Sequence, residues 1–296
     1  MKKSYLLLHI AVILAGFTGI FGKLITLNEG LLVWYRMLFA SLILFVILRF
    51  TRKHRMLHFR EKIAIGKVGL LLMTHWVLFY ASIKYANVSI GVVCYCLTSF
   101  FTAIFEPLIN KKKFVPTELV LSALTLLGIS LIFHFDTSYQ LGILIGTISS
   151  SFAALYTIFN ERLVKNYDSK VINYYQMISG TCVLALLMPL YLRYFPTDNL
   201  FPGLTDLLYL LFLALFCTVL LYMLFAESLK QISAFTVNLS FNLEPIYAII
   251  LAFWLFNEGK EVNLSFYVGC TFVMTSVVLQ SLIARRKRLK TARIKS

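Results

Sequence analysis

Long apolar stretches separated by short polar links recur along the whole chain. A helix that crosses the hydrocarbon core of a bilayer needs about 20 mainly apolar residues, and ten stretches meet this requirement. Most of the links are short, which favours antiparallel neighbours in a tight bundle. We therefore predict an all-α membrane protein with ten transmembrane helices. The predicted helices cover residues 4–27, 30–49, 63–83, 88–110, 116–134, 140–160, 171–193, 205–226, 232–256 and 263–284.

The composition excludes an ordinary soluble protein. Hydrophobic residues make up 59% of the chain and charged residues 14%, whereas a soluble domain is about 45–50% apolar and about 25% charged. The first stretch begins like a signal peptide, with Lys2 and Lys3 before an apolar core, but the core continues to about Ile25 and further spans follow. An uncleaved first helix is therefore expected.

The distribution of the net charge of +15 indicates a membrane surface and not a nucleic acid. No RNP-like, zinc-finger or helix-turn-helix pattern is present, so no nucleic-acid partner is expected. With a cytoplasmic N-terminus, the ten spans place 22 of the 28 Lys and Arg residues on the cytoplasmic side, 3 on the outer side and 3 within spans. The positive-inside rule requires such an asymmetry. We predict an inner-membrane protein, embedded in the lipid bilayer, with both termini in the cytoplasm.

Two halves of the chain look alike. Ser82 and Lys84 begin "SIKYANVSIGVVCYCLTSFF", and Ser228 and Lys230 hold the matching places in "SLKQISAFTVNLSFNLEPIY". Each half has five predicted spans, and because five is odd the second half enters the membrane from the opposite side. In such inverted repeats the substrate site lies near the membrane midplane at the repeat interface. The predicted units are a first five-helix repeat at 1–135, a second at 136–285 and a basic cytoplasmic tail at 286–296.

Several stretches together resemble the EamA family of the drug/metabolite transporter superfamily. They are "GFTGIFGKL", "WYRMLFASLIL", "FYASIKYANVSIGVV" and "LFAESLKQISAFTVNLSFNLEPIYAIILAFWLFNEG". The resemblance covers nearly the whole chain. It implies two inverted five-helix repeats around a central cavity that moves small metabolites such as amino acids. The halves differ at Thr98–Ser99, which stands where the second half has Glu244–Pro245.

The main candidate for function is Glu244, about midway along the ninth predicted helix. A charged residue at the centre of a membrane helix costs about 2.5–3.5 kcal/mol on insertion scales and usually faces the bundle interior. Asn238 and Asn242 lie near the same face, so an inward polar stripe is expected. Pro245 removes a backbone hydrogen bond and is a candidate hinge. Glu244 is a candidate for substrate binding or proton coupling; the alternative is a structural carboxylate that pairs with an Arg or Lys.

Further polar and aromatic residues lie at membrane depth. Arg36, six residues into the second helix, can bind a substrate carboxylate or pair with Glu244 or Glu29. Lys23, near the outer end of the first helix, can serve the site or extend to the interface. The other candidate substrate-binding or coupling residues, each with core packing as its alternative, are His75, Trp76, Tyr80, Tyr95, Tyr156, Asn160, Tyr175 and Gln176.

The sequence lacks the HExxH, GxSxG and P-loop motifs of common enzyme classes. We therefore do not expect an enzyme, a cofactor, a metal site or ATP hydrolysis. Inverted repeats favour alternating access over a channel. We predict a secondary transporter that exports small organic metabolites such as amino acids, as a monomer or homodimer, with protons as a candidate coupling ion. A drug-efflux carrier is the alternative, and a channel or a membrane-embedded enzyme is less favoured.

Overall fold

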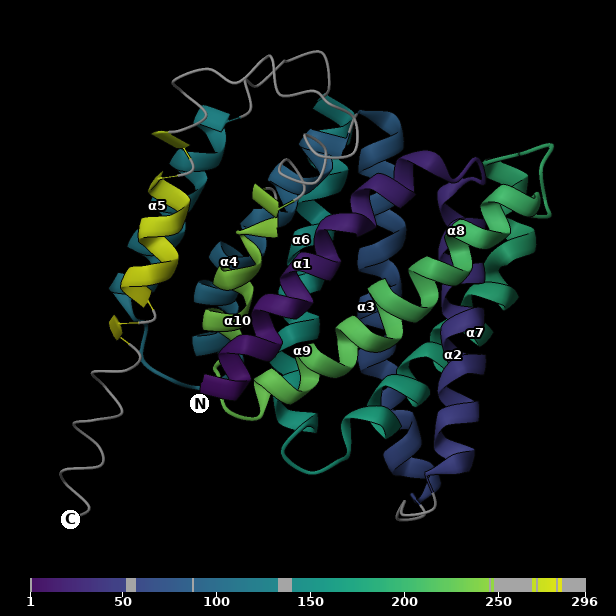
Figure 1. Ribbon diagram of the computed structural model, residues 1–296, viewed down its shortest axis with the longest axis horizontal. Helices are drawn as coiled ribbons and strands as arrows, with labels where there is room; N and C mark the ends of the chain where they lie inside the picture. Colours follow the sequence, from purple (N-terminus) through teal and green to yellow (C-terminus); the bar gives the residue numbers. More distant parts are fainter. Residues whose placement is uncertain are drawn as a thin grey trace.

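The computed structural model of the chain describes residues 2–51, 57–86, 88–132, 140–244, 246–247, 268–269, 271–280 and 282–283. The described segments are mainly helices joined by short turns (Figure 1). They are α1 (Lys2–Leu24), α2 (Glu29–Phe50), α3 (Phe59–Tyr85), α4 (Val88–Asn110), α5 (Pro116–Ile132), α6 (Gln140–Leu163), α7 (Ser169–Tyr194), α8 (Leu204–Ala214), the π-helix η2 (Leu215–Leu220), α9 (Leu221–Leu229) and α10 (Ala234–Phe241). Because α8, η2 and α9 follow one another directly, they form one membrane-length segment, Leu204–Leu229.

Seven helical segments in the described part of the chain are long and apolar enough to cross a membrane. They coincide with the first four predicted spans and with the sixth, seventh and eighth, so these elements are confirmed as helices. α5, with 17 residues, matches the fifth span, and Thr271–Gln280 is a shorter apolar helix within the tenth. The ninth span begins as α10, but residues 248–256 lie outside the described residues. The count of ten therefore stays a prediction.

The first helix of each half packs against the third span of the other half, α1 against α9 and α6 against α3. Matching serines join the two pairs. Ser82 Oγ in α3 donates to the carbonyl oxygen of Gly142 in α6 at 2.7 Å, and Ser228 Oγ in α9 donates to the carbonyl oxygen of Ser4 in α1 at 3.1 Å. Ser82 and Ser228 are the residues that the sequence repeat aligns. The repeat in the sequence therefore corresponds to a repeat in the structure.

α1 and α6 run in opposite directions, as inverted repeats require. Tyr5 near the start of α1 and Glu106 near the end of α4 line one cavity. Arg162 near the end of α6 donates through Nε to Asn110 Oδ1 at the end of α4 at 3.0 Å. The start of α1 and the end of α6 therefore lie at the same end of the bundle (Figure 1). We call it the basic end, because it also carries Lys112, Lys165, Lys170 and Lys230.

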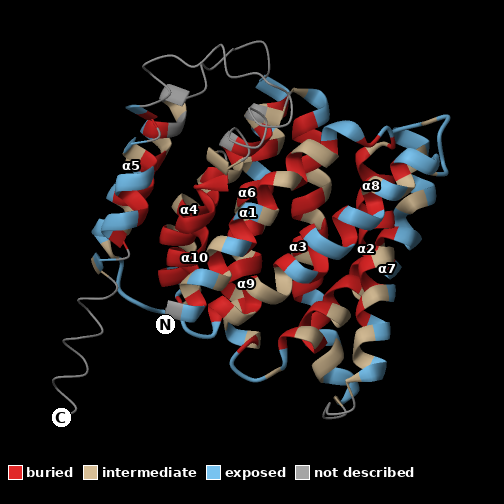
Figure 2. Cartoon of the chain, in the orientation of Figure 1, coloured by how far each residue is buried: buried red, intermediate tan, exposed pale blue. Residues whose placement is uncertain are grey.

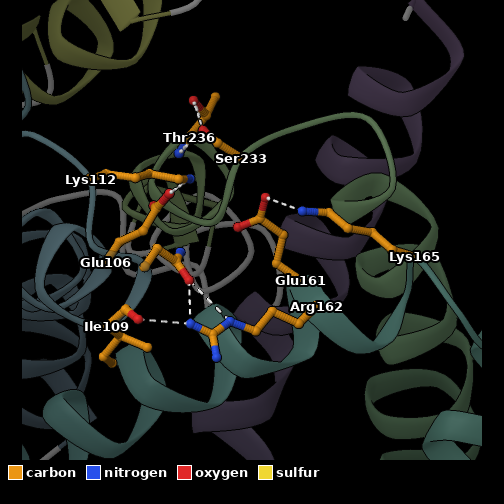
Figure 3. A network of polar contacts seen from close by, with 9 residues as sticks. Glu106, Ile109, Lys112, Glu161, Arg162, Lys165, Ser233 and Thr236 are labelled. Carbon is orange, nitrogen blue, oxygen red and sulfur yellow. Dashed lines mark hydrogen bonds and ion pairs between the residues drawn. The ribbon is translucent and has the colours of Figure 1, made fainter.

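Polar contacts join helix termini at the basic end (Figure 3). Lys112 Nζ lies 2.9 Å from Glu106 Oε1, and Lys165 Nζ lies 3.6 Å from Glu161 Oε1. Partial burial lowers the pKa of Lys112, but its hydrogen bond to Glu106 and the charge of that carboxylate outweigh burial and raise the pKa. Lys112 accordingly stays charged at neutral pH. The cavity beside this pair has a volume of about 320 Å³.

The opposite end of the bundle is closed around the turn between α1 and α2. The backbone N–H of Thr26 donates to the Asp206 carboxylate in the first turn of α8 at 3.1 Å, and the Thr26 hydroxyl donates to it at 2.6 Å. Lys84 Nζ, near the end of α3, donates to the carbonyl oxygens of Ile25 and Leu27. Because α3 and α8 both hold this turn, α1 and α2 are fixed relative to each other at this end.

Buried residues lie on the inside of the bundle and exposed residues on its outside (Figure 2). The buried residues are mainly apolar with polar ones among them, and many large apolar side chains are also exposed. Every residue of α10 is buried, which makes α10 an inner helix. By contrast, Leu186 in α7 is 80% exposed and Leu204 in α8 is 76% exposed. Large apolar side chains on the outside are suited to lipid, where the hydrophobic effect does not drive them inward.

Gly69 in α3 lies so close to α7 that an added Cβ atom would be 2.5 Å from the Cα and the carbonyl oxygen of Gln176. Since backbone atoms cannot turn aside as side chains can, we expect Gly69→Ala to lower the free energy of unfolding by about 1–3 kcal/mol. Gly203→Ala is the matched control, because nothing lies within 4 Å of the added Cβ atom there. Thermal unfolding in detergent measures the difference. Equal melting temperatures for the two variants would contradict the tight α3–α7 contact.

Candidate functional site

Arg36 in α2 stands at the centre of the candidate site. It is 1% exposed, and its guanidinium donates three hydrogen bonds inside the protein. Nε donates to the Thr218 hydroxyl at 2.7 Å, Nη1 to the Tyr80 hydroxyl at 2.8 Å and Nη2 to the Cys217 carbonyl oxygen at 2.7 Å. None of these three partners is a carboxylate. Neutral oxygen atoms from α3 and η2 therefore hold the guanidinium in place.

Glu29, which the sequence offers as a partner for Arg36, has a different contact. Its carboxylate accepts a hydrogen bond from the Tyr191 hydroxyl in α7 at 2.7 Å. Glu29 begins α2, so this bond connects α2 to α7 at the end of the bundle opposite the basic end. The contact places Glu29 in the packing of the helices, away from the candidate site.

The π-helix η2 explains why one acceptor of Arg36, the Cys217 carbonyl oxygen, is available. In an α-helix, the Leu221 N–H would donate to the carbonyl oxygen of Cys217. Here it donates to the carbonyl oxygens of Phe216 and Thr218. The Cys217 carbonyl oxygen is thereby released from that bond and accepts one from Arg36. Single π-turns within helices are rare and are frequent at functional sites.

Aromatic rings surround the guanidinium. Arg36 Cζ lies 3.8 Å from the centre of the Trp76 ring, a cation–π contact that contributes about 0.5–2 kcal/mol. Trp76 Nε1 donates to the Tyr222 hydroxyl in α9 at 3.1 Å. Tyr222 packs in turn on Tyr156 in α6, with ring centres 6.0 Å apart. The rings thus continue from α3 of the first half to α6 and α9 of the second.

His75 in α3 is held by α6. Its Nδ1 atom lies 2.8 Å from the Ser149 hydroxyl, and that hydroxyl donates to the His75 backbone carbonyl oxygen at 2.8 Å. The imidazole also packs on the Tyr95 ring, with centres 5.4 Å apart. These contacts give His75 a packing role between α3 and α6, while its side chain still reaches the cavity described next.

A small cavity lies between Arg36 and Glu244. Its volume is about 30 Å³, which is room for about two or three water molecules, whereas ligand pockets commonly measure about 300–1,000 Å³. A second small cavity adjoins it and shares His75, Tyr95 and Tyr222 in its wall. The described conformation is therefore closed, and a metabolite fits only after the lining helices separate. The first cavity is lined by Ala15, Thr18, Arg36, His75, Trp76, Phe79, Tyr95, Leu221, Tyr222, Phe241 and Glu244.

Six of the predicted site residues line these cavities. They come from α2, α3, α4, α6 and the segment after α10, and so from both halves of the chain. The six are Arg36, His75, Trp76, Tyr95, Tyr156 and Glu244. Tyr80 is not in either wall, but its hydroxyl accepts from Arg36.

The predicted polar stripe of the ninth span contacts α4 and α6 and does not line the cavity. Asn238 Nδ2 donates to Thr102 Oγ1 at 2.7 Å, and Asn238 Oδ1 accepts from Thr157 Oγ1 at 3.0 Å. Asn242 Nδ2 donates to Ser99 Oγ at 3.0 Å. These bonds connect the buried helix α10 to its neighbours. The contacts favour a structural role for both asparagines.

A second polar cluster lies between α6 and α7. Gln176 Nε2 donates to Asn160 Oδ1 at 2.9 Å, and the Tyr156 hydroxyl donates to Gln176 Oε1 at 3.4 Å. Asn173, one turn from Gln176, has no hydrogen-bond partner for either amide atom among the described residues. Asn160 and Gln176 are thus placed behind Tyr156 and not in the cavity wall.

The remaining predicted residues lie elsewhere. Lys23 is exposed on α1, and the Tyr175 ring faces Lys62 Nζ at 5.7 Å. Pro245 lies outside the described residues, so its role as a hinge stays a prediction. Among the residues that the structure describes, no three His, Cys, Asp or Glu side chains gather as a metal site would require.

The residues that the sequence did not indicate belong mainly to the eighth span: Cys217, Thr218 and Tyr222. The span is mainly apolar, and a carbonyl oxygen released by a π-turn has no side-chain signal. Tyr222 carried a usable signal, because a tyrosine hydroxyl at membrane depth needs a hydrogen-bond partner.

Comparison with known proteins gives a consistent match along the chain. The EamA-like transporter family matches residues 2–134 and 140–282. An "Uncharacterized transporter" of Clostridium kluyveri is 26% identical over 208 residues, which cover 67% of this chain and 65% of that protein, less than two thirds of its length. The "Uncharacterized transporter YyaM" of Bacillus subtilis is 23% identical over 85% of this chain and 84% of its own.

A third relative and a solved structure extend over most of the chain. An "Uncharacterized transporter" of Haemophilus influenzae is 23% identical over 86% of both chains. One crystal structure superposes with a TM-score of 0.74, covering 97% of this chain and 99% of its own, at 14% identity. At that identity the superposition shows a shared fold alone.

Asn238 and Asn173 are both buried amides but differ in their partners, which allows a matched test. Asn238→Leu removes two hydrogen bonds, so we expect it to lower the free energy of unfolding by about 1–3 kcal/mol. Asn173→Leu removes an amide that has no hydrogen-bond partner among the described residues, so its melting temperature should stay equal or rise. Thermal unfolding in one detergent compares them. A greater loss for Asn173→Leu than for Asn238→Leu would contradict these assignments.

Proposed function

This chain belongs to the EamA-like transporter family, and from that premise we propose that it is a secondary transporter of small organic metabolites such as amino acids. The proposed direction is export across the inner membrane. The proposed mechanism is alternating access, in which the cavity between the two halves opens to one side of the membrane at a time. We propose that substrate transport is coupled to the movement of protons across the membrane.

The observation that carries the proposal is the placement of Arg36 and Glu244 on one cavity. Arg36 comes from the first half of the chain and Glu244 from the second. Charged residues at membrane depth are costly and mark substrate or ion pathways. A cavity lined by one basic side chain, one acidic side chain and several aromatic rings suits a small molecule with both polar and apolar parts. An amino acid has this chemistry.

The packing of the two halves supports alternating access. The cavity wall combines α1, α2, α3 and α4 with α9 and the segment after α10, so a relative movement of the halves would open it. Hydrogen bonds hold both ends of the bundle in the described conformation, at Thr26 and Asp206 on one side and at Arg162 and Asn110 on the other. Export requires these two sets of contacts to break in turn.

Efflux of aromatic cations is the second candidate function. The lining residues Trp76, Tyr95 and Tyr222 offer aromatic faces, and Glu244 offers a carboxyl group. Aromatic faces attract cations and pack against flat apolar rings. This candidate uses the same cavity and the same cycle, and it differs from the first only in the substrate.

Counterflow into proteoliposomes tests the proposal. The panel consists of amino acids and aromatic cations. For each compound, purified protein is reconstituted into vesicles that contain the unlabelled compound, and uptake of the same compound in labelled form is measured. Saturable, protein-dependent counterflow of any member supports a carrier and identifies its substrate class. Single-channel currents, or no flux of any panel member through folded protein, would contradict it.

Glu244→Gln removes the charge at the cavity and keeps the size of the side chain. If Glu244 carries the coupled proton, we expect counterflow to persist while accumulation driven by a pH gradient falls at least tenfold. Glu29→Gln is the matched control, because Glu29 contacts Tyr191 away from the cavity. Unchanged gradient-driven accumulation by Glu244→Gln would remove Glu244 from the coupling mechanism.

The orientation also has a direct test. Because the basic end should face the cytoplasm, Lys112→Cys should react with a membrane-impermeant maleimide only after the cells are permeabilised. Asn199→Cys, in the link between α7 and α8 at the opposite end, should react in intact cells. A background without the native cysteines excludes other reactions. The reverse labelling pattern would mean that the chain is inserted the other way round.

A further inference from the structure

The hydrogen bonds of Arg36 leave a defined part of its guanidinium for a ligand. An arginine side chain has five N–H groups, one on Nε and two on each terminal nitrogen. Thr218 takes the N–H of Nε, Tyr80 takes one from Nη1, and the Cys217 carbonyl takes one from Nη2. Among the residues that the structure describes, no acceptor takes the second N–H of either terminal nitrogen. Arg36 also lines the cavity, so its side chain borders the space for a substrate.

The position of the guanidinium depends on the π-helix of the other half. Thr218 Oγ1 accepts from Arg36 and donates to the carbonyl oxygen of Leu213, five residues back, at 2.8 Å. The threonine hydroxyl is therefore fixed from both sides. The neighbouring Cys217 carbonyl is released by the same π-turn. Trp76 covers a face of the guanidinium at 3.8 Å, so the group can neither turn nor tilt freely.

We propose that Thr218 is a positioning residue and that the Arg36 guanidinium, held by η2, recognises a carboxylate on the substrate. The two N–H groups that remain are on two nitrogens of one planar group, and a planar carboxylate can accept from both at once. This inference rests on the proposed transport function and narrows it, since it makes a carboxylate a requirement for binding. Substrates without a carboxylate cannot accept from both of these N–H groups in this way.

A purely structural role for the same contacts makes a different prediction. If Arg36 only connects α2, α3 and η2, a change at Thr218 weakens the fold and affects all substrates alike. If Thr218 positions the guanidinium, the same change selectively weakens the binding of substrates that carry a carboxylate. The comparison between an amino acid and its amide separates the two roles, because the amide keeps the shape and the amine but lacks the carboxylate charge.

The test uses the full-length protein and three variants. Thr218→Val removes the hydroxyl and keeps the shape, and Thr218→Ser retains the hydroxyl. Thr181→Val is the matched control, because the buried Thr181 hydroxyl donates only to the Met177 carbonyl of its own helix at 2.8 Å. Each protein is assayed by counterflow and by ligand-induced thermal stabilisation with a panel of L-amino acids and their amides.

We expect the wild-type protein to prefer at least one amino acid over its amide. For that amino acid, Thr218→Val should raise the half-saturating concentration about tenfold or more, with little change in the maximal rate. An effect of this size is expected for the loss of a hydrogen bond to a charged group. Thr218→Ser should restore wild-type behaviour, and Thr181→Val should match the wild type. Binding of the amide should change little in any variant.

Three results would overturn the inference. If Thr218→Val weakened the binding of the amino acid and of its amide equally, Thr218 would have a structural role. Failure of Thr218→Ser to restore selectivity would exclude the hydroxyl as the positioning group. Transport of amides or aromatic cations, with no response to any carboxylate, would exclude carboxylate recognition while leaving the transporter proposal intact. Absence of all flux in folded wild-type protein would instead remove the proposed function itself.

Discussion

A single buried guanidinium is the interaction around which the centre of this protein is organised. Burying a charge away from water is costly unless hydrogen bonds and other charges compensate for it. Arg36 meets this demand with oxygen atoms from α3 and η2 and with the face of Trp76. Tyr80 and Trp76 belong to α3 in the first half, and Thr218 and Cys217 belong to η2 in the second. The first half of the chain therefore cannot bury its arginine without the second half.

Much of the fold could be predicted from the sequence, because lipid imposes simple rules. A span must be long, apolar and hydrogen-bonded within itself, and α1 to α4, α6, α7 and the segment Leu204–Leu229 follow these rules. The repeat was visible through Ser82 and Ser228, whose equivalent hydrogen bonds depend on their hydroxyl groups. The exchange of first helices between halves was not predictable, because it depends on which faces pack together.

The candidate site was predictable in its parts but not in its arrangement. Arg36 and Glu244 stand out because a charge in an apolar run is costly, and both line the cavity. Asn238 and Asn242 were grouped with Glu244 by helical spacing, yet their amides meet Thr102 and Ser99. The spacing along one helix predicts which residues share a face. Which helix packs against that face depends on the whole bundle.

The exchange of first helices has a consequence for synthesis of the chain. Ser4 and its partner Ser228 are separated by 224 positions, so α1 emerges from the ribosome long before α9 exists. At about 5–20 residues per second, the delay is roughly 10–45 s. During that interval α1 has no native partner on the face that later meets α9, and lipid or an insertase must shield it. The earliest helix to be made is thus among the last to find its final neighbour.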